Sequence, residues 1–137
     1  MRAWFTDESV GVDVGLKMLV TLSNGERLSD VPTSIKRLTQ FGVVCIETLS
    51  PGIKGIRKFN QFFKQLEDAC KVSGTKVIKI GRFFPSTRKC SSCGVVRNAI
   101  PTRIRIWTCV FCKAEHDRDF NAAKNIHLEG LRLLSVG

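Results

Sequence analysis

The sequence has no apolar run long enough to cross a membrane, and its first residues, MRAWFTDESVG, carry acids where a signal peptide would carry its apolar segment. Internal repeats and low-complexity tracts are also missing. These absences argue against membrane insertion and secretion. We therefore expect a cytoplasmic protein of the cytosol or the nucleoid, with no membrane partner.

Acidic residues are scarce, since twelve Asp and Glu stand against twenty-two Lys and Arg, for a net charge of +10. Such a balance favours a polyanionic partner such as DNA or RNA, although a lysine-rich solvated surface would give the same charge. The basic residues are spread along the chain, so no cationic tail explains the excess. With 43% hydrophobic residues, the 137-residue chain can form one domain that carries a small insertion.

Cysteine is limited to six residues, of which four form two CxxC pairs. Disulfides are not expected in a reducing compartment, so the spacing of the cysteines is more informative than their number. Two CxxC turns at this separation can arrange four thiolates tetrahedrally around Zn²⁺, and such a closed site would be structural. The predicted zinc ligands are Cys90, Cys93, Cys109 and Cys112. His116 is then not required as a ligand, and we expect it at the surface or beside the site.

The hydrophobic pattern predicts an α/β protein. Residues 9–31 alternate around Asn24-Gly25, a pair typical of a two-residue hairpin turn, and predict three strands in a meander. A short helix over residues 33–41 is expected next, capped by Thr33 or Ser34, and an apolar strand follows over residues 42–47. After a Pro- and Gly-containing loop, we expect a helix ending at Gly74, a strand over 75–81, the cysteine region and a final helix over 120–134. This order excludes a pure sandwich or bundle and fits an α/β sheet with an antiparallel start.

Three acids lie at the ends of predicted elements: Asp13 inside VGVDVG, Glu47 at the end of GVVCIE, and Asp119 just before the final helix. Each acid alone fits an ordinary role, as a hydrogen-bonded turn acid, a strand-end acid or a helix cap. Together they match a two-metal phosphodiester site, because Mg²⁺ and Mn²⁺ prefer carboxylate oxygens. Asp117 is the rival of Asp119 for the third position.

Basic residues near these positions are candidate phosphate contacts. A mobile basic loop after Glu47 could close over a bound strand, although a solvated loop explains the same residues. Phe83 and Phe84 could stack on bases, but phenylalanine is more often a core residue. The predicted nucleic-acid-binding residues are Lys54, Arg57, Lys58, Arg82, Arg88, Lys89, Arg103 and Arg105.

The motifs resemble a known family. The segments GVDVGLKMLVTLSNGE, VCIETL, FFPSTRKCSSCG, WTCVFC and HDRDFNAAKNI resemble the three RuvC motifs and the zinc ribbon of TnpB (OrfB-type) insertion-sequence proteins, which are related to type V CRISPR effectors. The resemblance implies a ribonuclease H-like (RuvC) mixed sheet with an inserted four-cysteine zinc ribbon. It also implies that Asp13, Glu47 and Asp119 are catalytic acids that bind Mg²⁺ or Mn²⁺. Asp119 matches the family pattern better than Asp117, because it lies two residues before Asn121.

The resemblance further implies a division into a first part of the nuclease core (1–82), a zinc ribbon (83–116), and a last part with the final acid and helix (117–137). Similar family members are guide-RNA-directed DNA endonucleases of transposable elements, which implies DNA and guide RNA as partners and the bacterial cytosol or nucleoid as location. The chain begins almost at the first motif, so we expect it to lack the N-terminal part that recognises guide and target. A non-cleaving zinc-ribbon binding module, or a fragment that needs a partner domain, is the alternative.

Overall fold

The computed structural model describes residues 9–136, and residues 1–8 and 137 lie outside the described residues. Most of the N-terminal stretch that argues against a signal peptide is therefore not described. A five-stranded sheet has the order β3-β2-β1-β4-β5, and β6 and β7 form a separate two-stranded sheet. The strands are β1 (Ser9–Val14), β2 (Val20–Leu22), β3 (Arg27–Leu28), β4 (Val43–Glu47), β5 (Lys76–Ile80), β6 (Ile106–Thr108) and β7 (Glu115–Asp117). The helices are α1 (Val31–Leu38), α2 (Ile56–Ser73) and α3 (Arg118–Val136).

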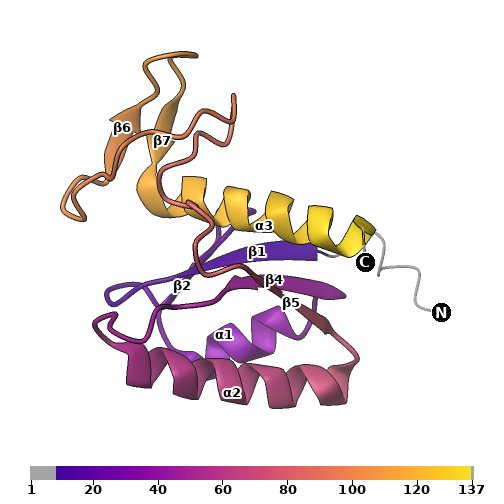
Figure 1. Cartoon of the computed structure of the whole chain (residues 1–137). Coiled ribbons are helices and arrows are strands. Elements are labelled where there is room, and N and C mark those ends of the chain that lie inside the picture. Colours follow the sequence, from indigo (N-terminus) through magenta and orange to yellow (C-terminus); the bar gives the residue numbers. More distant parts are fainter. Residues whose placement is uncertain (1–8, 137) are drawn as a thin grey trace.

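The larger sheet is mixed. β1 pairs antiparallel with β2 and parallel with β4, and β4 pairs parallel with β5. The predicted α/β sheet with an antiparallel start is therefore confirmed. Figure 1 shows α1 and α2 on one face of this sheet and α3 on the other, while the small sheet projects from the N-terminal end of α3. Within residues 9–136, no helix is both long and apolar enough to span a membrane.

Two helical layers explain why the central strands are mostly apolar, since strands covered on both faces cannot alternate with polar residues. On one face, Val10 and Val12 of β1 belong to the main core with Phe62 of α2. On the other face, α3 approaches closely because β1 carries Gly11. A Cβ atom at Gly11 would overlap the carbonyl oxygen of Ala123 in α3. Because Gly11 has no side chain, α3 can lie close to β1 at this position.

Two local predictions about turns and caps were wrong. The Asn24-Gly25 turn is not a two-residue type I′ turn, because among residues 9–136 Lys113 is the one non-glycine residue with positive φ. Instead, Gly25 (φ 96°) closes a longer turn in which its N–H donates to the Leu22 carbonyl at 2.9 Å. α1 is capped by Asp30, whose carboxylate accepts from the Thr33 N–H at 2.9 Å, so Pro32 lies inside the first turn. Proline is well suited to that position, because the first N–H groups of a helix have no intrahelical partner.

The segment after β4 also differs from the prediction. α2 begins at Ile56, so Arg57 and Lys58 lie in its first turn and only Lys54 remains on the loop. Gly74 ends α2 with φ 82°, as its position in the sequence predicted.

Candidate metal centres

The two cysteine turns share one backbone geometry. In the first turn the Gly94 N–H donates to the Cys90 carbonyl at 2.8 Å, and in the second the Lys113 N–H donates to the Cys109 carbonyl at 2.9 Å. Gly94 and Lys113 directly follow the last cysteine of each pair, and both have positive φ, 85° and 68°. The repeated geometry turns both sulfurs of each pair to the same side.

The four cysteine side chains converge, with all of their Sγ atoms within 4.8 Å of one another. Cys90 and Cys112 Sγ are 3.6 Å apart, as are Cys93 and Cys109 Sγ. A regular tetrahedron with Zn–S bonds of 2.3 Å requires about 3.8 Å between sulfurs, so the cluster has the size that zinc needs. Hydrogen bonds from the Cys112 and Phe111 N–H groups lower the pKa of the Cys109 thiol to about 6, which favours the thiolate form. The predicted convergence of Cys90, Cys93, Cys109 and Cys112 is confirmed.

His116 was expected at the surface or beside the site, and the second alternative is correct. It is 4% exposed, its Nε2 lies 3.0 Å from Cys90 Sγ, and its ring centroid is 4.8 Å from that of Trp107. Burial and the charge of Lys124 lower the pKa of the imidazole. The pairing of β6 with β7 sets His116 opposite Trp107, and the alternation of Glu115, His116 and Asp117 along a strand was the signal for this inward position.

Two buried asparagines of α3 attach the first cysteine turn to the helix. Asn121 accepts from the Ser91 N–H at 2.9 Å and donates to the Lys89 carbonyl at 2.8 Å. Asn125 donates to the Ser86 and Lys89 carbonyls at 2.9 and 2.7 Å. Sequence reasoning missed this role for Asn125, although two amides four residues apart beside the buried Ala122 and Ala123 were a visible signal.

The three predicted acids come from three different elements. Asp13 lies on β1, Glu47 ends β4, and Asp119 lies in the first turn of α3. Asp13 is 8% exposed. Burial raises its pKa well above the usual value, the charges of Glu47 and Asp119 raise it further, and Arg105 and Arg118 lower it. The fold therefore brings the carboxyl groups of Glu47 and Asp119 within electrostatic reach of Asp13.

Glu47 has a similar environment. Burial raises the pKa of its carboxyl to about 7, and a hydrogen bond from Ser86 offsets part of this rise. A group of uncompensated buried carboxyls is costly unless a cation neutralises it. The acids thus fit a hard divalent cation by charge and donor type. The acids are less tightly gathered than the sulfurs. Within residues 9–136, the four cysteines are the one group of three or more Cys, His, Asp or Glu side chains close enough together to share a metal ion.

Asp119 forms ion pairs with two arginines from separate parts of the chain. Arg105, on the segment just before β6, forms a close ion pair with it, and Arg27 of β3 lies 3.8 Å away. Arg27 also pairs with Asp117 at 2.7 Å. Asp117 caps α3 by accepting from the Phe120 N–H at 3.0 Å, which agrees with a capping role for this acid.

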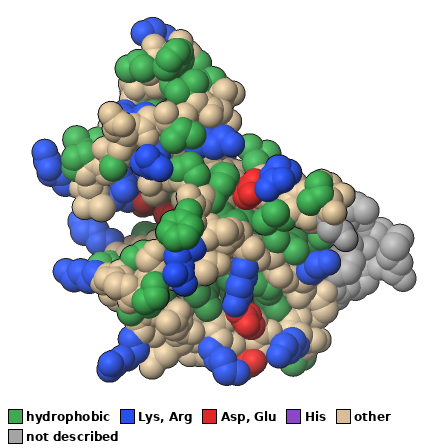
Figure 2. Space-filling view, viewed as in Figure 1, with side chains coloured by type: hydrophobic (Ala, Val, Ile, Leu, Met, Phe, Trp, Pro, Cys, Tyr) green, Lys and Arg blue, Asp and Glu red, His purple; other side chains and the backbone are tan. Residues whose placement is uncertain are grey.

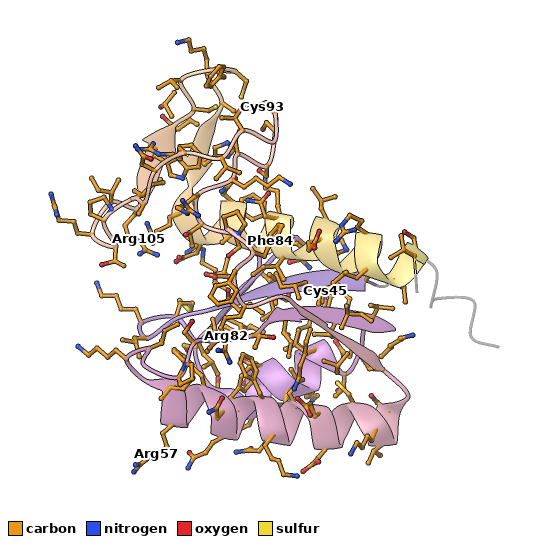
Figure 3. The ribbon with its side chains drawn as sticks, viewed as in Figure 1. Cys45, Arg57, Arg82, Phe84, Cys93 and Arg105 are labelled. Carbon is orange, nitrogen blue, oxygen red and sulfur yellow. The ribbon has the colours of Figure 1, made fainter. Side chains whose placement is uncertain are left out.

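The predicted nucleic-acid-binding residues do not form one cluster. Figure 3 shows Arg105 beside the start of α3 and Arg57 on the other side of the large sheet. Lys89 lies 5.5 Å over the ring of Phe84, and Phe84 packs against a core cluster, whereas Phe83 is 88% exposed. Lys54 lies on an exposed loop, Lys58 in the exposed first turn of α2, and Arg82 in an exposed turn after β5. Arg88 lies on the partly buried approach to the first cysteine turn, and Arg103 on the exposed loop before β6.

Residues 59–126 match the model of the Cas12f1-like TNB domain. Over 72 residues the chain is 46% identical to the "Putative RNA-guided DNA endonuclease" of Streptomyces pristinaespiralis, a match that covers 53% of this chain and 18% of that protein. It is 34% identical over 74 residues to a TnpB-like protein of Acanthamoeba polyphaga mimivirus, covering 54% of this chain and 14% of the relative. The aligned regions are thus less than a fifth of the length of these relatives.

The fold resembles solved structures at low sequence identity. A chain of a Cas12f1–sgRNA–target DNA complex superposes with a TM-score of 0.69 at 16% identity, covering 88% of this chain and 50% of that one. A chain of a CRISPR–Cas12f ternary complex gives 0.63 at 17% identity, covering 88% and 38%. The matched domain and the TnpB-like relatives agree with each other, and over about half of its length the chain resembles proteins of the TnpB-type family.

Proposed function

We propose that this chain is the RuvC-like nuclease part of a transposon-encoded, TnpB-type RNA-guided DNA endonuclease. In this proposal the large sheet is a ribonuclease H-like core formed by residues 1–82 and 117–137, and residues 83–116 are a zinc ribbon inserted between them. DNA would be the substrate and guide RNA a partner of the full-length architecture. The bacterial cytosol or nucleoid is the corresponding location.

The observation that carries the proposal is the buried carboxyl of Asp13, whose pKa is raised by burial and by the charges of Glu47 and Asp119. These acids are supplied by β1, by the end of the neighbouring parallel strand β4, and by the start of the helix that covers β1. The raised pKa values of Asp13 and Glu47 reflect a cost to folding and are typical of functional sites. A metal site that hydrolyses phosphodiesters gives these acids a common role.

Asp13 would be the central ligand of the Mg²⁺ or Mn²⁺ ions, because it is the most buried of the three acids and its pKa is raised by the charges of the other two. Glu47 and Asp119 would be the other carboxylate ligands. Bound ions of this kind would supply an activated water and stabilise the departing oxygen. The protein contributes the placement of the carboxylates, and Arg105 pairs with Asp119 from the ribbon side.

A role for the basic residues follows from their placement. Arg105 pairs with Asp119, and Arg103 lies two residues before it on the same exposed segment, where both would contact the phosphates that flank a cleaved bond. Lys54, Arg57, Lys58, Arg82, Arg88 and Lys89 are spread more widely and would bind the backbone of DNA or RNA along a longer path.

Cleavage of single-stranded DNA by the purified, zinc-loaded chain with Mn²⁺ or Mg²⁺ tests this function. Asp13→Ala and Asp119→Ala should remove cutting, whereas Asp68→Ala should not, because Asp68 is an exposed acid paired with Lys64 at 3.2 Å on α2. Thermal unfolding of each variant verifies that the proteins compared are folded. Cutting that persists in Asp13→Ala would refute the assignment of the acids.

A second candidate function is a nucleic-acid-binding module that does not cleave, or a fragment that needs a partner domain for cleavage. The ion pairs of Asp119 with Arg105 and Arg27 favour this alternative, since they neutralise one of the three acids. The same assay distinguishes the two, because a module of this kind would bind the oligonucleotide and leave it intact.

A further inference from the structure

One histidine lies against a single sulfur of the cysteine cluster. His116 and Cys90 are both buried, and His116 Nε2 lies 3.0 Å from Cys90 Sγ. His116 is not one of the side chains whose ligand atoms all lie within 4.8 Å of one another. The imidazole therefore contacts a zinc ligand and is not placed to be a ligand itself.

The other three sulfurs have N–H donors from the backbone. They accept hydrogen bonds from their own turns: from the Val95 N–H to Cys93, from the Cys112 and Phe111 N–H groups to Cys109, and from the Ala114 N–H to Cys112. Hydrogen bonds to a charged acceptor are stronger than neutral ones, and they disperse the negative charge of a thiolate. A bond from His116 to Cys90 gives each of the four sulfurs such a donor.

The direction of this bond follows from the chemistry of the ligand. A thiolate that binds zinc has no proton, so Cys90 Sγ accepts and Nε2 of His116 carries the hydrogen. Residues 83–116 contain one acid, Glu115, against six basic residues, and Figure 2 shows hydrophobic and basic side chains together on the part of the molecule formed by the ribbon. Four thiolates around one Zn²⁺ carry an excess of negative charge in these surroundings. The Nε2–H group reduces that charge at a sulfur that is buried from solvent.

Two separate segments hold the donor and the acceptor in place. The pairing of β6 with β7 sets His116 opposite Trp107, with the ring centroids 4.8 Å apart, and the Arg97 guanidinium lies 5.2 Å from the centroid of the Trp107 ring. Asn121 fixes the first cysteine turn through its bonds to the two residues that flank Cys90. Because both partners are already held, the hydrogen bond forms with little loss of conformational entropy.

We propose that His116 is a positioning residue of the zinc site, which donates from Nε2–H to the Cys90 thiolate and so strengthens the hold of the four cysteines on Zn²⁺. Loss of a hydrogen-bond partner of a metal ligand typically lowers metal affinity by about 10- to 100-fold. The inference does not rest on the proposed nuclease function, since it concerns the ribbon and none of the three acids.

The absorption spectrum of the Co²⁺-substituted whole chain tests the bond. His116→Phe keeps a flat ring against Trp107 but removes the donor. The sulfur-to-cobalt charge-transfer band should then move to longer wavelength, because the thiolate becomes more electron-rich. His116→Gln keeps an N–H donor at a similar reach and should leave the band near its original position. The d–d bands should remain those of a tetrahedral four-sulfur site in both variants.

Competition with a chromophoric chelator measures the zinc affinity of the same proteins. His116→Phe should bind Zn²⁺ about 10- to 100-fold more weakly, and His116→Gln should restore most of the affinity. His127→Phe is the matched control and should change neither the affinity nor the band. His127 is a histidine of α3 whose Nε2 lies 2.8 Å from Ser9 Oγ, outside the cluster. The fluorescence of Trp107 in a Trp4→Phe background verifies that each zinc-loaded ribbon is folded.

The two variants separate the hydrogen bond from packing. If His116 acted only by packing against Trp107, His116→Phe would bind zinc like the original chain and His116→Gln would bind it weakly, which would overturn the proposal. A change of the d–d bands in both variants would also overturn it, by identifying His116 as a ligand. If His116→Phe binds no Co²⁺, His116→Gln decides alone: a spectrum and affinity near the original support the bond, and their loss refutes it.

None of these measurements uses DNA, Mg²⁺ or Mn²⁺. Failure of the His116 proposal therefore leaves the nuclease proposal standing, and absence of DNA cleavage says nothing about the bond to Cys90.

Discussion

The cysteine cluster and the acid cluster differ in how their ligands are brought together. The sulfurs come from two short turns, each fixed by its own backbone hydrogen bonds, and they lie within 4.8 Å of one another. The carboxyl groups come from β1, β4 and α3, and they are gathered less closely. Local structure thus shapes the two cysteine turns, whereas the acid cluster depends on the packing of the whole sheet.

This difference predicts different responses to perturbation. The ribbon has a small core of Cys90, Ile100, Trp107 and Cys109 and should depend on its metal. The large sheet has an extensive apolar core and should fold without any ion but be sensitive to overpacking. Four experiments test this contrast, beginning with the one of largest expected effect.

Removal of zinc should unfold the ribbon and leave the large sheet folded. Structural zinc sites contribute on the order of 10 kcal/mol to the folding of small domains, far more than the ribbon core can supply. Cys90→Ser, or chelation, should therefore expose Trp107, which is 6% exposed in the folded ribbon. The red shift of Trp107 fluorescence in a Trp4→Phe background reports this change, and far-UV circular dichroism should retain the signal of the sheet and helices.

Cys70→Ser is the control for zinc removal, since Cys70 is a buried thiol of α2 outside the cluster. It should retain the ribbon and its Trp107 signal. A single transition in which ribbon and sheet unfold together in Cys90→Ser would contradict the separation of the two regions.

The local character of the ribbon also explains what could be predicted from the sequence. The spacing of two CxxC pairs largely determines their local geometry, so the convergence of the four cysteines was predicted correctly. The order of strands and helices followed from apolar periodicity and the Gly74 cap. Other features depend on residues distant in sequence. The burial of His116 requires the pairing of β6 with β7, and the arginine partners of Asp119 come from β3 and the ribbon. No pattern within one segment indicates the arginine partners of Asp119.

The prediction of the α1 cap was wrong for a related reason. Thr33 and Ser34 are good capping residues, but the chain begins the helix earlier, and Asp30 supplies the cap while the Ser34 hydroxyl donates to the Asp30 carbonyl at 2.7 Å. Pro32 is compatible with this earlier start, because proline is a favourable residue in the first turn of a helix. The choice between these positions depends on which residues the helix must bury against the core, and the sequence alone does not contain that information.

Gly11→Ala should destabilise the large sheet without affecting zinc binding. The added Cβ would overlap the Ala123 carbonyl oxygen and lie 2.6 Å from the His127 backbone nitrogen, and backbone atoms of a packed helix cannot give way easily. Overpacking of this kind costs about 1–3 kcal/mol or more in free energy of unfolding. Chemical denaturation measures it. Gly52→Ala is the control, because a Cβ there meets nothing within 4 Å, and an equal loss in both proteins would contradict the close approach of α3.

The zinc-loaded chain without Mg²⁺ or Mn²⁺ should lose stability as the pH rises from about 5 to about 7. Burial raises the pKa of Glu47 from its ordinary value of 4.5 to about 7, so within this window the folded chain binds more protons than the unfolded chain. Stability falls with pH where the folded state holds the extra protons, and the loss is complete above the folded pKa. Denaturation midpoints measured across this range should decline, and Glu47→Gln should flatten the decline.

Glu129→Gln provides the comparison for the pH experiment. Its hydrogen bond with Arg132 lowers the pKa of Glu129, so this acid titrates below the window and its removal should leave the slope unchanged. If the slope for Glu47→Gln matches that of the unaltered chain, burial is not the source of the pH dependence.

Arg105→Ala should strengthen the binding of Mn²⁺ to the acid cluster by a small factor. Arg105 is paired with Asp119 and lowers the pKa of Asp13, so it competes with any cation for the same charges. Its side chain is 50% exposed, and exposed ion pairs contribute about 0.2–1 kcal/mol, which corresponds to at most about a fivefold gain in affinity. Titration of the zinc-loaded chain with Mn²⁺, followed by electron paramagnetic resonance, measures this.

Arg103→Ala is the matched control, since Arg103 is an exposed arginine of the same segment and should leave Mn²⁺ affinity unchanged. The sign of the Arg105 effect decides between two views of the cluster. If Arg105 only competes with the metal for the charge of Asp119, the Arg105→Ala protein binds Mn²⁺ more tightly. If Arg105 instead positions Asp119, its loss lets that acid turn away and Mn²⁺ binds less tightly. Weaker binding in Arg105→Ala would therefore mean that the ribbon, through this arginine, preassembles part of the acid site as well.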